Sequence, residues 1–360
     1  MELAFEIPLR RLCRMKIERA QVRKILVIKL RAIGDVLLST IVLDNLRAAF
    51  PHARIHFLTE RPSREVIEGN PNLDGVLIFD GKYEHGLGLI VKVRRKQFDL
   101  VIDLFGNPRS ALVTLFSGAR YRVGYRFKWR KYCYNIVVEP RGGEVHNAEF
   151  NLDALRKMEV SIIARDISFP LDAAAEQFAE SFAAEAGLSG KRVIALNPGG
   201  GWYTKRWRIQ HFARLGDLIA EEFDASILLI WGPGEEEDAS VIQSIMRSKS
   251  VVIPRTNLKQ LAALLKRCSV LVTNDSGPMH IAAAMKTSVV AIFGPTNPDL
   301  QGPFGVKHEI VQNQQLLCLG CNYTKCPIGN PCMEDLSVDD VFRSFKMLMG
   351  SPNLVSERSR

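Results

Sequence analysis

The sequence has no apolar run long enough to cross a bilayer, and its first twenty residues carry charges where a secretory signal would carry an apolar block. Cysteine is scarce, and four of the seven residues gather near the C-terminus, unlike the even framework of a small secreted domain. These absences speak against a membrane-spanning or disulfide-built protein. We therefore expect a cytoplasmic protein with reduced thiols.

Three short motifs are also missing. No G-x-x-x-x-G-K-[ST] occurs, so the chain has no P-loop for a nucleoside triphosphate. No G-x-G-x-x-G follows an expected strand, which leaves a dinucleotide-binding oxidoreductase with little support. No Asp-x-Asp pair occurs that would hold a divalent metal. A phosphate-bearing ligand would have to be bound by other groups.

The length of 360 residues exceeds what one hydrophobic core usually holds, and one pattern runs through the chain twice. Short β-branched runs alternate with longer amphipathic ones, which is typical of βα units and a parallel sheet. We predict an α/β fold of two Rossmann-like, doubly wound parallel-sheet domains that face a central cleft. The expected strands are 24–30, 54–58, 76–79, 99–104 and 135–138 in the first domain, and 192–197, 226–231, 251–253, 270–273 and 288–293 in the second.

Charge is divided unevenly between the expected segments, which are a basic extension (1–23), two domains (24–170 and 171–336) and a C-terminal helix and tail (337–360). Residues 1–170 hold 29 Lys and Arg against 19 Asp and Glu, a net charge of +10. The remaining residues hold 19 against 20, a net charge of −1. A basic half attracts nucleic acid, an anionic membrane or a phosphorylated substrate, and charge alone does not choose among them.

The turn after the first expected strand carries the first candidate residue. Gly34 allows a sharp turn, and Asp35 opens a helix expected over residues 35–50. An acid at a helix start is most often a cap. Because Asp35 lies at the mouth of the first domain, it is also a candidate general base.

Glycine-rich turns follow two strands of the second domain. Gly199, Gly200 and Gly201 let backbone amides approach a ligand closely, and Lys205 and Arg206 follow within reach of a phosphate. The next strand ends in a similar turn, where Glu235 is placed to accept hydrogen bonds from ribose hydroxyls.

A fourth turn joins a strand to a helix at Asp275, Ser276, Gly277 and His280. Backbone amides, a hydroxyl and the positive end of the helix together form an anion site suited to a diphosphate. Read alone, Asp275 would be a cap and His280 a packing residue. This turn falls at the same end of the same expected sheet as the two glycine-rich turns, which favours a functional interpretation.

In order and spacing these turns resemble the lipopolysaccharide heptosyltransferases of glycosyltransferase family 9. The resemblance runs from about Lys24 to the final helix and rests on residues 24–36, 197–207 and 274–280. It implies the GT-B fold and an inverting, metal-independent transfer of a heptose from ADP-heptose to the inner core of lipopolysaccharide. The expected partners are the ADP-sugar, a phosphorylated glycolipid (lipid A with inner-core sugars) and the inner membrane surface, with no nucleic acid.

The resemblance also implies roles for individual residues. Asp35 matches the catalytic base, and Lys205 matches the lysine that neutralises the departing diphosphate. Asp275, Ser276, Gly277 and His280 match the loop that holds the donor. A hydroxyl found near the diphosphate in some members falls on Gly201 here, and the ribose-binding acid aligns only loosely with Glu235.

Two other segments stand out. Residues 120–132 hold six cations, five aromatic residues and no acid. They could serve single-stranded nucleic acid or an anionic membrane, and the family resemblance favours an acceptor or membrane surface. Its candidate cations are Arg120, Arg122, Arg126, Lys128, Arg130 and Lys131.

Four clustered cysteines form the second segment: Cys318, Cys321, Cys326 and Cys332. Their spacing matches no standard zinc ribbon, so a structural metal and free thiols remain open. We expect no cofactor for catalysis.

The alternatives are a transferase of another nucleotide sugar, a dinucleotide-binding oxidoreductase, and a non-enzymatic module that binds membrane or nucleic acid. The oxidoreductase lacks its glycine fingerprint. The binding module leaves the glycine-rich turns of the second domain unexplained.

Overall fold

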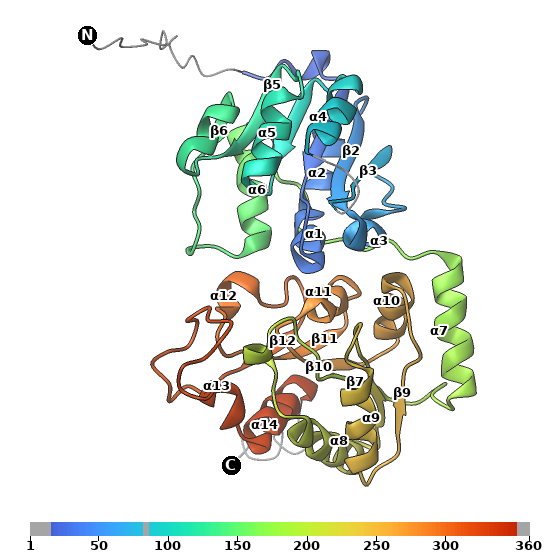
Figure 1. Ribbon diagram of the computed structural model, residues 1–360. Coiled ribbons are helices and arrows are strands. Elements are labelled where there is room, and N and C mark those ends of the chain that lie inside the picture. Colours follow the sequence, from blue (N-terminus) through green and yellow to red (C-terminus); the bar gives the residue numbers. More distant parts are fainter. Residues whose placement is uncertain (1–15, 82–85, 351–360) are drawn as a thin grey trace, which may run out of the picture.

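The computed structural model describes residues 16–81 and 86–350, which form two stacked α/β domains (Figure 1). Each domain contains a six-stranded parallel sheet with helices on its faces. The predicted α/β class and doubly wound architecture are therefore confirmed. No helix in these two ranges is long and apolar enough to span a membrane.

The first sheet has the strand order β3-β2-β1-β4-β5-β6. Its central strand β1 is almost entirely buried, as expected of an apolar strand covered on both faces. The strands are β1 (Lys24–Ile28), β2 (Arg54–Glu60), β3 (Gly75–Phe79), β4 (Leu100–Asp103), β5 (Tyr121–Tyr125) and β6 (Ile136–Val138). The helices are α1 (Ile33–Ser39), α2 (Ile41–Ala49), α3 (Arg64–Ile67), α4 (Gly86–Arg95), α5 (Pro108–Phe116) and α6 (Asn147–Lys157), with the short 3-10 helices η1 (Arg19–Gln21), η2 (Arg61–Ser63) and η3 (Lys128–Cys133).

The second sheet has the order β12-β11-β10-β7-β8-β9. Its strands are β7 (Val193–Asn197), β8 (Ser226–Leu229), β9 (Ser250–Val252), β10 (Val270–Asn274), β11 (Ser288–Ile292) and β12 (His308–Val311). Around them lie α7 (Ala173–Glu185), α8 (Ile209–Phe223), α9 (Glu236–Ile245), α10 (Leu258–Lys266), α11 (Gly277–Ala284), α12 (Pro298–Gln301), α13 (Pro331–Glu334), α14 (Val338–Met349) and the 3-10 helix η4 (Tyr203–Lys205). Strand order reverses at β1/β4 in one sheet and at β7/β10 in the other. Ligands of such sheets bind outside the carboxyl ends of the strands at these points.

The structure corrects several sequence-based expectations. Residues 120–132 were expected to form an acceptor or membrane surface, but they contain strand β5, in which Tyr121, Val123 and Tyr125 are buried. Strand β12 was not predicted. The helix expected over residues 35–50 is two helices that meet at Thr40. Helix α14, predicted as a separate terminal segment, packs its apolar face into the second domain's core through Val341 and Phe345.

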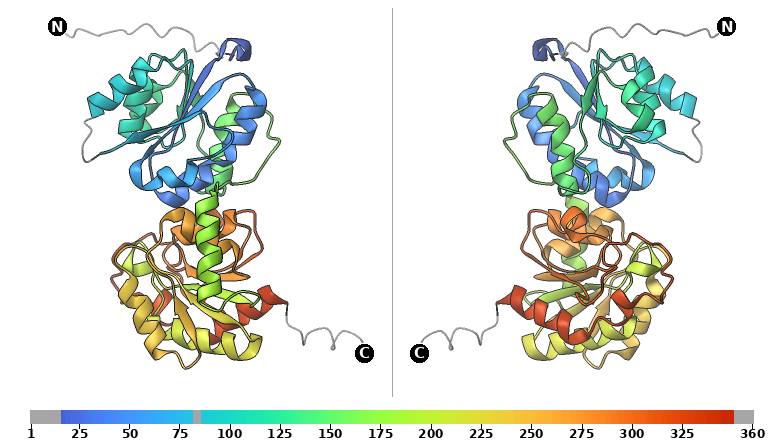
Figure 2. Two further views of the ribbon diagram at one scale, coloured as in Figure 1. Left: turned by 90° about the vertical axis from the view of Figure 1, so that its right-hand side faces the viewer. Right: turned by 90° about the vertical axis from the view of Figure 1, so that its left-hand side faces the viewer.

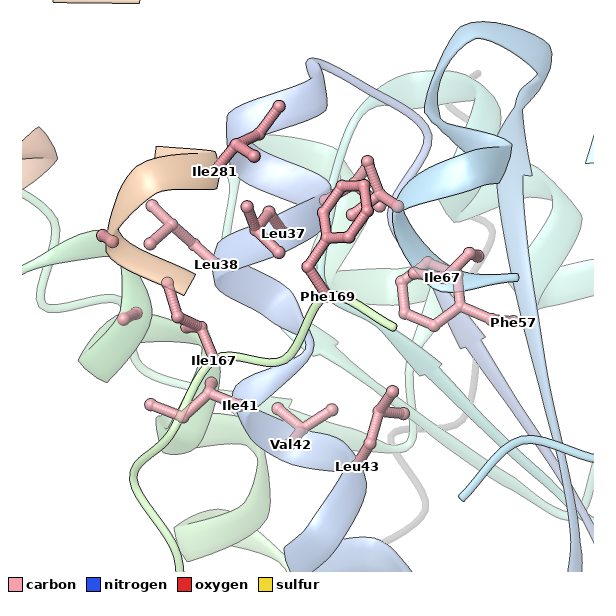
Figure 3. Close-up of a cluster of buried hydrophobic side chains, with 14 of the residues drawn as sticks. Leu37, Leu38, Ile41, Val42, Leu43, Phe57, Ile67, Ile167, Phe169 and Ile281 are labelled. Carbon is pink, nitrogen blue, oxygen red and sulfur yellow. The ribbon is translucent and has the colours of Figure 1, made fainter. Parts of the chain in front are cut away.

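An apolar cluster joins the two domains (Figure 3). Leu37 and Leu38 of α1 lie beside Ile281 of α11, and Ile167 of the connecting segment lies with them; all four are buried. Helix α7 then carries the chain into the second domain along its outer side (Figure 2).

Polar contacts also cross between the domains. The Leu258 N–H donates to Glu65 Oε2 (2.8 Å), and Lys259 Nζ donates to the Glu68 carbonyl (2.9 Å). The His146 Nε2–H donates to the Gly302 carbonyl (3.0 Å), since its Nδ1 accepts from the Ala148 N–H. The carboxyl ends of both sheets are therefore held against one another.

Candidate active site

The candidate site lies where the first turn of α1 meets the first turn of α11. Helix α1 follows β1, and α11 follows β10, so both helices begin at the points where strand order reverses. His280 lies at this junction, close enough to Asp35, Asp275, His146 and Lys205 for their charges to act on its imidazole. The structure thus brings together Asp35 of the first domain and Lys205 and Asp275 of the second.

Asp35 is the third residue of α1 and not its N-cap, which is Ala32. Its Oδ2 accepts only a long hydrogen bond from the Ala32 N–H (3.4 Å), and the side chain is partly exposed. An acid at the third position of a helix makes this contact in a capping box, and here the contact is long. The carboxylate is left able to accept a proton from a ligand.

Lys29 was not predicted as a site residue, because it lies within the first expected strand, residues 24–30. Its ammonium donates to the Leu104 carbonyl (3.1 Å) and lies near Asp35 and Asp103. Burial lowers the pKa of Lys29, and the charges of the two acids partly offset this. While protonated, Lys29 places a positive charge beside Asp35 and Asp103.

Lys205 forms a short ion pair with Asp275. Its Nζ lies 2.6 Å from Asp275 Oδ2, which also accepts from Thr296 Oγ1 at 2.7 Å. The same ammonium lies 4.4 Å from the centre of the Trp202 ring. Both charged side chains are largely buried, so this pair is held in one geometry and presents a fixed positive group.

The Glu235 carboxylate connects the two glycine-rich turns by hydrogen bonds. It accepts from the Gly200 N–H (3.0 Å), the Gly232 N–H (3.1 Å) and Arg206 (3.0 Å). A Cβ on Gly199 would overlap this carboxylate, which is a reason for glycine there. Arg206 also donates to the Gly200 carbonyl (2.9 Å). Glu235 and Arg206 were both predicted to bind the nucleotide sugar, but in this structure their side chains bind groups of the turns themselves. Their roles toward a ligand stay predictions.

Two asparagines that were not singled out in the sequence connect the turns. Asn197 donates to Thr273 Oγ1 and Ser276 Oγ, both at 2.9 Å. Asn274 donates to the Pro198 carbonyl (2.7 Å) and accepts from the Trp207 N–H (3.2 Å). Each lies at the end of a buried strand, the position that marks a ligand-bearing edge, and this signal was available in the sequence.

The start of α11 offers free backbone donors. Ser276 is its N-cap but makes no side-chain cap, since its hydroxyl is engaged with Asn197 and Thr273. The first N–H groups of a helix have no partner within it and carry the positive end of the dipole. A diphosphate beside Gly277 would therefore meet amides and the Lys205 ammonium together.

His280 is buried and its Nδ1 has no hydrogen-bond partner. Burial lowers its pKa to about 4, although Asp275 and Asp35 act in the opposite direction. The imidazole is therefore neutral at pH 7. Its ring lies directly against Gly34, where an added Cβ would overlap Cδ2. Gly34 was expected to serve a sharp turn, but it lies inside α1 without a positive φ, and its lack of a side chain admits the His280 ring.

Other residues of the first domain do not face a ligand. Asp103, at the end of β4, is fully buried and accepts hydrogen bonds from two backbone N–H groups and the Tyr134 hydroxyl. Of the predicted surface cations, Arg122 turns inward to the Ala119 and Cys133 carbonyls, a correction to its expected exposure. Arg120 pairs with Glu18.

The four clustered cysteines form no disulfide in this structure. Burial raises the pKa of Cys332 to about 11, and the charges of the other three add to the rise. Among the residues that the structure describes, no three Cys, His, Asp or Glu side chains are placed to hold a metal ion. The segment also contacts the site, because the Tyr323 carbonyl accepts a hydrogen bond from Thr204, the neighbour of Lys205.

Comparison with known proteins gives the same family as the sequence motifs of the turns. The model of glycosyltransferase family 9 (heptosyltransferase) matches residues 87–331, more than half of the chain. The chain belongs to this family. The family resemblance predicted from the sequence is therefore confirmed.

Individual relatives of this family 9 protein differ in how much of the chain they match. It is 32% identical to lipooligosaccharide heptosyltransferase 2 of Campylobacter jejuni over 46% of this chain, and spans about half (54%) of that protein's length. It is 28% identical to lipopolysaccharide heptosyltransferase 2 of Escherichia coli, over 80% of this chain and 88% of the relative. A solved family 9 glycosyltransferase from Veillonella parvula superposes with a TM-score of 0.81 at 25% identity, covering 91% of this chain and 97% of that one.

We predict that Gly34→Ala lowers the thermal midpoint, because the new methyl group overlaps the His280 ring and overpacking typically costs about 1–3 kcal/mol. Gly86→Ala is the control, since a Cβ there meets no neighbouring atom. In a His280→Ala background the added methyl has room, so Gly34→Ala should then cost little. An equal loss in both backgrounds would show that the ring contact does not set the need for glycine.

The pKa of His280 predicts a specific loss of stability in acid. Because its pKa falls from 6.5 to about 4 on folding, the unfolded chain binds the proton more readily as pH falls through this window. Full stability is present above pH 6.5, and at pH 5 about 2 kcal/mol has been lost through this group. The thermal midpoint should therefore fall less between pH 7 and pH 5 in His280→Asn than in the unchanged protein. A parallel fall in both would contradict the assignment.

Proposed function

We propose that this family 9 protein is an inverting, metal-independent glycosyltransferase that moves a heptose from ADP-heptose to the inner core of lipopolysaccharide. The observation that carries the proposal is the meeting of Asp35 with the Lys205–Asp275 pair around His280. One domain supplies a base and the other supplies a fixed cation, which are the two groups that such a transfer needs.

The second domain binds the donor in this proposal. Negative charge develops on the diphosphate as its bond to the anomeric carbon breaks, so preorganised donors beside it lower the barrier most. Lys205 and the amides at the start of α11 supply this positive field, and the turns held by Asn197 and Asn274 fix their positions. The glycine-rich turn after β7 allows the nucleotide to approach the backbone.

The first domain binds the acceptor. Asp35 takes the proton from the acceptor hydroxyl as its oxygen attacks the anomeric carbon, while the bond to the diphosphate oxygen breaks and the electron pair leaves with ADP. Attack from the face opposite the leaving group inverts the anomeric centre.

The acceptor in this proposal is lipid A with its inner-core sugars, at the cytoplasmic face of the inner membrane. The names of the relatives support it, since both are heptosyltransferases of lipopolysaccharide or lipooligosaccharide. A transferase of another nucleotide sugar would use the same groups. Neither an oxidoreductase nor a non-enzymatic binding module would require an acid such as Asp35 opposite a lysine such as Lys205.

The sharpest test compares Asp35 with Lys205. Asp35→Asn should leave ADP affinity nearly unchanged and lower turnover roughly 100- to 10,000-fold, the usual worth of a general base. Lys205→Ala should weaken ADP binding and slow turnover as well, because the Lys205 charge acts on the diphosphate both in the bound ground state and in the transition state. Titration calorimetry with ADP, and with UDP, GDP and NAD for comparison, measures the first quantity and initial rates the second.

Controls separate chemistry from folding. Lys205→Gln keeps a hydrogen-bond donor for the buried Asp275, so a loss of binding in this variant is not due to an unpaired carboxylate. Glu139→Gln removes a surface carboxylate of the same domain and should behave as the unchanged protein. A near-normal rate for Asp35→Asn would make the base assignment wrong, and a preference for UDP, GDP or NAD would make the donor wrong.

We also predict that turnover persists in excess EDTA, because the chain has no Asp-x-Asp pair and Lys205 with the start of α11 provides the positive charge. Rates are measured with and without chelator, and circular dichroism reports any unfolding through loss of a metal at the four cysteines. Activity that disappears with intact helicity and returns with magnesium or manganese would contradict a metal-independent mechanism.

A further inference from the structure

Three adjacent elements of the first domain expose an unusual number of apolar side chains. Helices α4 and α5 and the 3-10 helix η3 lie on one face of the sheet, opposite α2 and α6 (Figure 2). Of the thirteen large hydrophobic residues that the described chain exposes, six belong to these elements: Leu87, Val91, Leu112, Phe116, Trp129 and Tyr132. A concentration of this kind marks an interaction site rather than ordinary surface.

The same face is exclusively basic. Helices α4 and α5 and η3 contain no acidic residue and seven cations, whereas α1, α2 and α6 each contain an acid. Some of these cations serve the fold, since Lys92 donates to the Ile78 carbonyl. Arg95, Arg109 and Lys128 are exposed among the apolar side chains.

The mixture of side chains identifies the occupant. Aliphatic residues such as Leu87, 77% exposed, gain little from stacking on a base but gain from entering acyl chains. Trp129 and Tyr132 are the residue types that favour a bilayer interface, and lysine side chains extend from there to phosphate groups. An anionic lipid surface fits all three features together.

The position of this face suits a membrane-held acceptor. Helices α4 and α5 begin after the carboxyl ends of β3 and β4, the edge of the sheet that is turned toward the second domain and carries Asp35 after β1. A glycolipid whose acyl chains stay in the bilayer would therefore present its sugars toward the same edge.

We infer that α4, α5 and η3 form a docking face for an anionic phospholipid bilayer. This differs from the surface predicted in the sequence, because Arg120 and Arg126 are paired with Glu18 and Glu139, while α4 and α5 contribute four of the six exposed apolar side chains. The inference rests on the proposed function only for the identity of the acceptor.

Vesicle sedimentation tests the face without any turnover. The full chain should bind vesicles of phosphatidylglycerol and phosphatidylcholine, and bind pure phosphatidylcholine at least tenfold less. The triple variant Phe116→Ser, Trp129→Ser, Tyr132→Ser should lose binding to the anionic vesicles at least tenfold. The matched control changes three equally exposed apolar residues elsewhere, Ile163→Ser, Ile245→Ser and Met347→Ser, and should bind normally. Lys128→Glu with Lys131→Glu should weaken binding and reduce its dependence on salt.

Rates on two forms of acceptor separate this inference from the proposed function. With the triple variant, KM for a vesicle-embedded acceptor should rise while the rate on a deacylated acceptor stays unchanged. Unaltered vesicle binding by the triple and charge variants would overturn the docking face, whatever the enzyme transfers. Tighter binding to a single-stranded oligonucleotide than to anionic vesicles would also overturn it, by assigning the face to nucleic acid. Normal vesicle binding without any heptosyl transfer would sink only the proposed function.

Discussion

The contact between the first turns of α1 and α11 is the constraint on which the site depends. It exists because Gly34 has no side chain and the His280 ring occupies the space. The apolar packing of Leu37 and Leu38 against Ile281 continues the same contact away from the site. Through it, a carboxylate on one sheet and a lysine on the other come to share one environment. Neither domain contains both groups.

The electrostatics of this junction follow from burial. His280 is neutral because the surroundings disfavour its charged form more than the two nearby acids favour it. The neutral ring lies near both Asp35 and the Lys205–Asp275 pair and adds no charge to either. Lys205 is held by an acid, a hydroxyl bond to that acid and an aromatic face, so it is positioned before any ligand arrives. Such preorganisation is what makes a fixed cation effective beside a leaving group.

The two faces of the first domain's sheet differ in their charges and in their exposed apolar side chains. One face of its sheet carries helices with mixed charges, and the other carries only cations among exposed apolar residues. The net charge of +10 in residues 1–170 therefore is not spread evenly. The face also lies beside the edge that bears Asp35, which places a lipid surface and the proposed chemistry at neighbouring positions.

Local pattern in the sequence determined the fold class, the ends of most strands and the turns that carry Asp35, Lys205 and Asp275. These features depend on hydrophobic period and on glycine, which are properties of neighbouring residues. Strand β5 was not predicted because Arg122 and Gly124 separate its buried Tyr121, Val123 and Tyr125, and both residue types are common at the surface. Only the tertiary structure decided that Gly34 accommodates His280, that Lys29 lies beside Asp35, that Glu235 is engaged by its own turns, and that Arg122 points inward. Each of these is a contact between residues distant in the chain or a choice of side-chain direction, and it follows from how the two sheets pack.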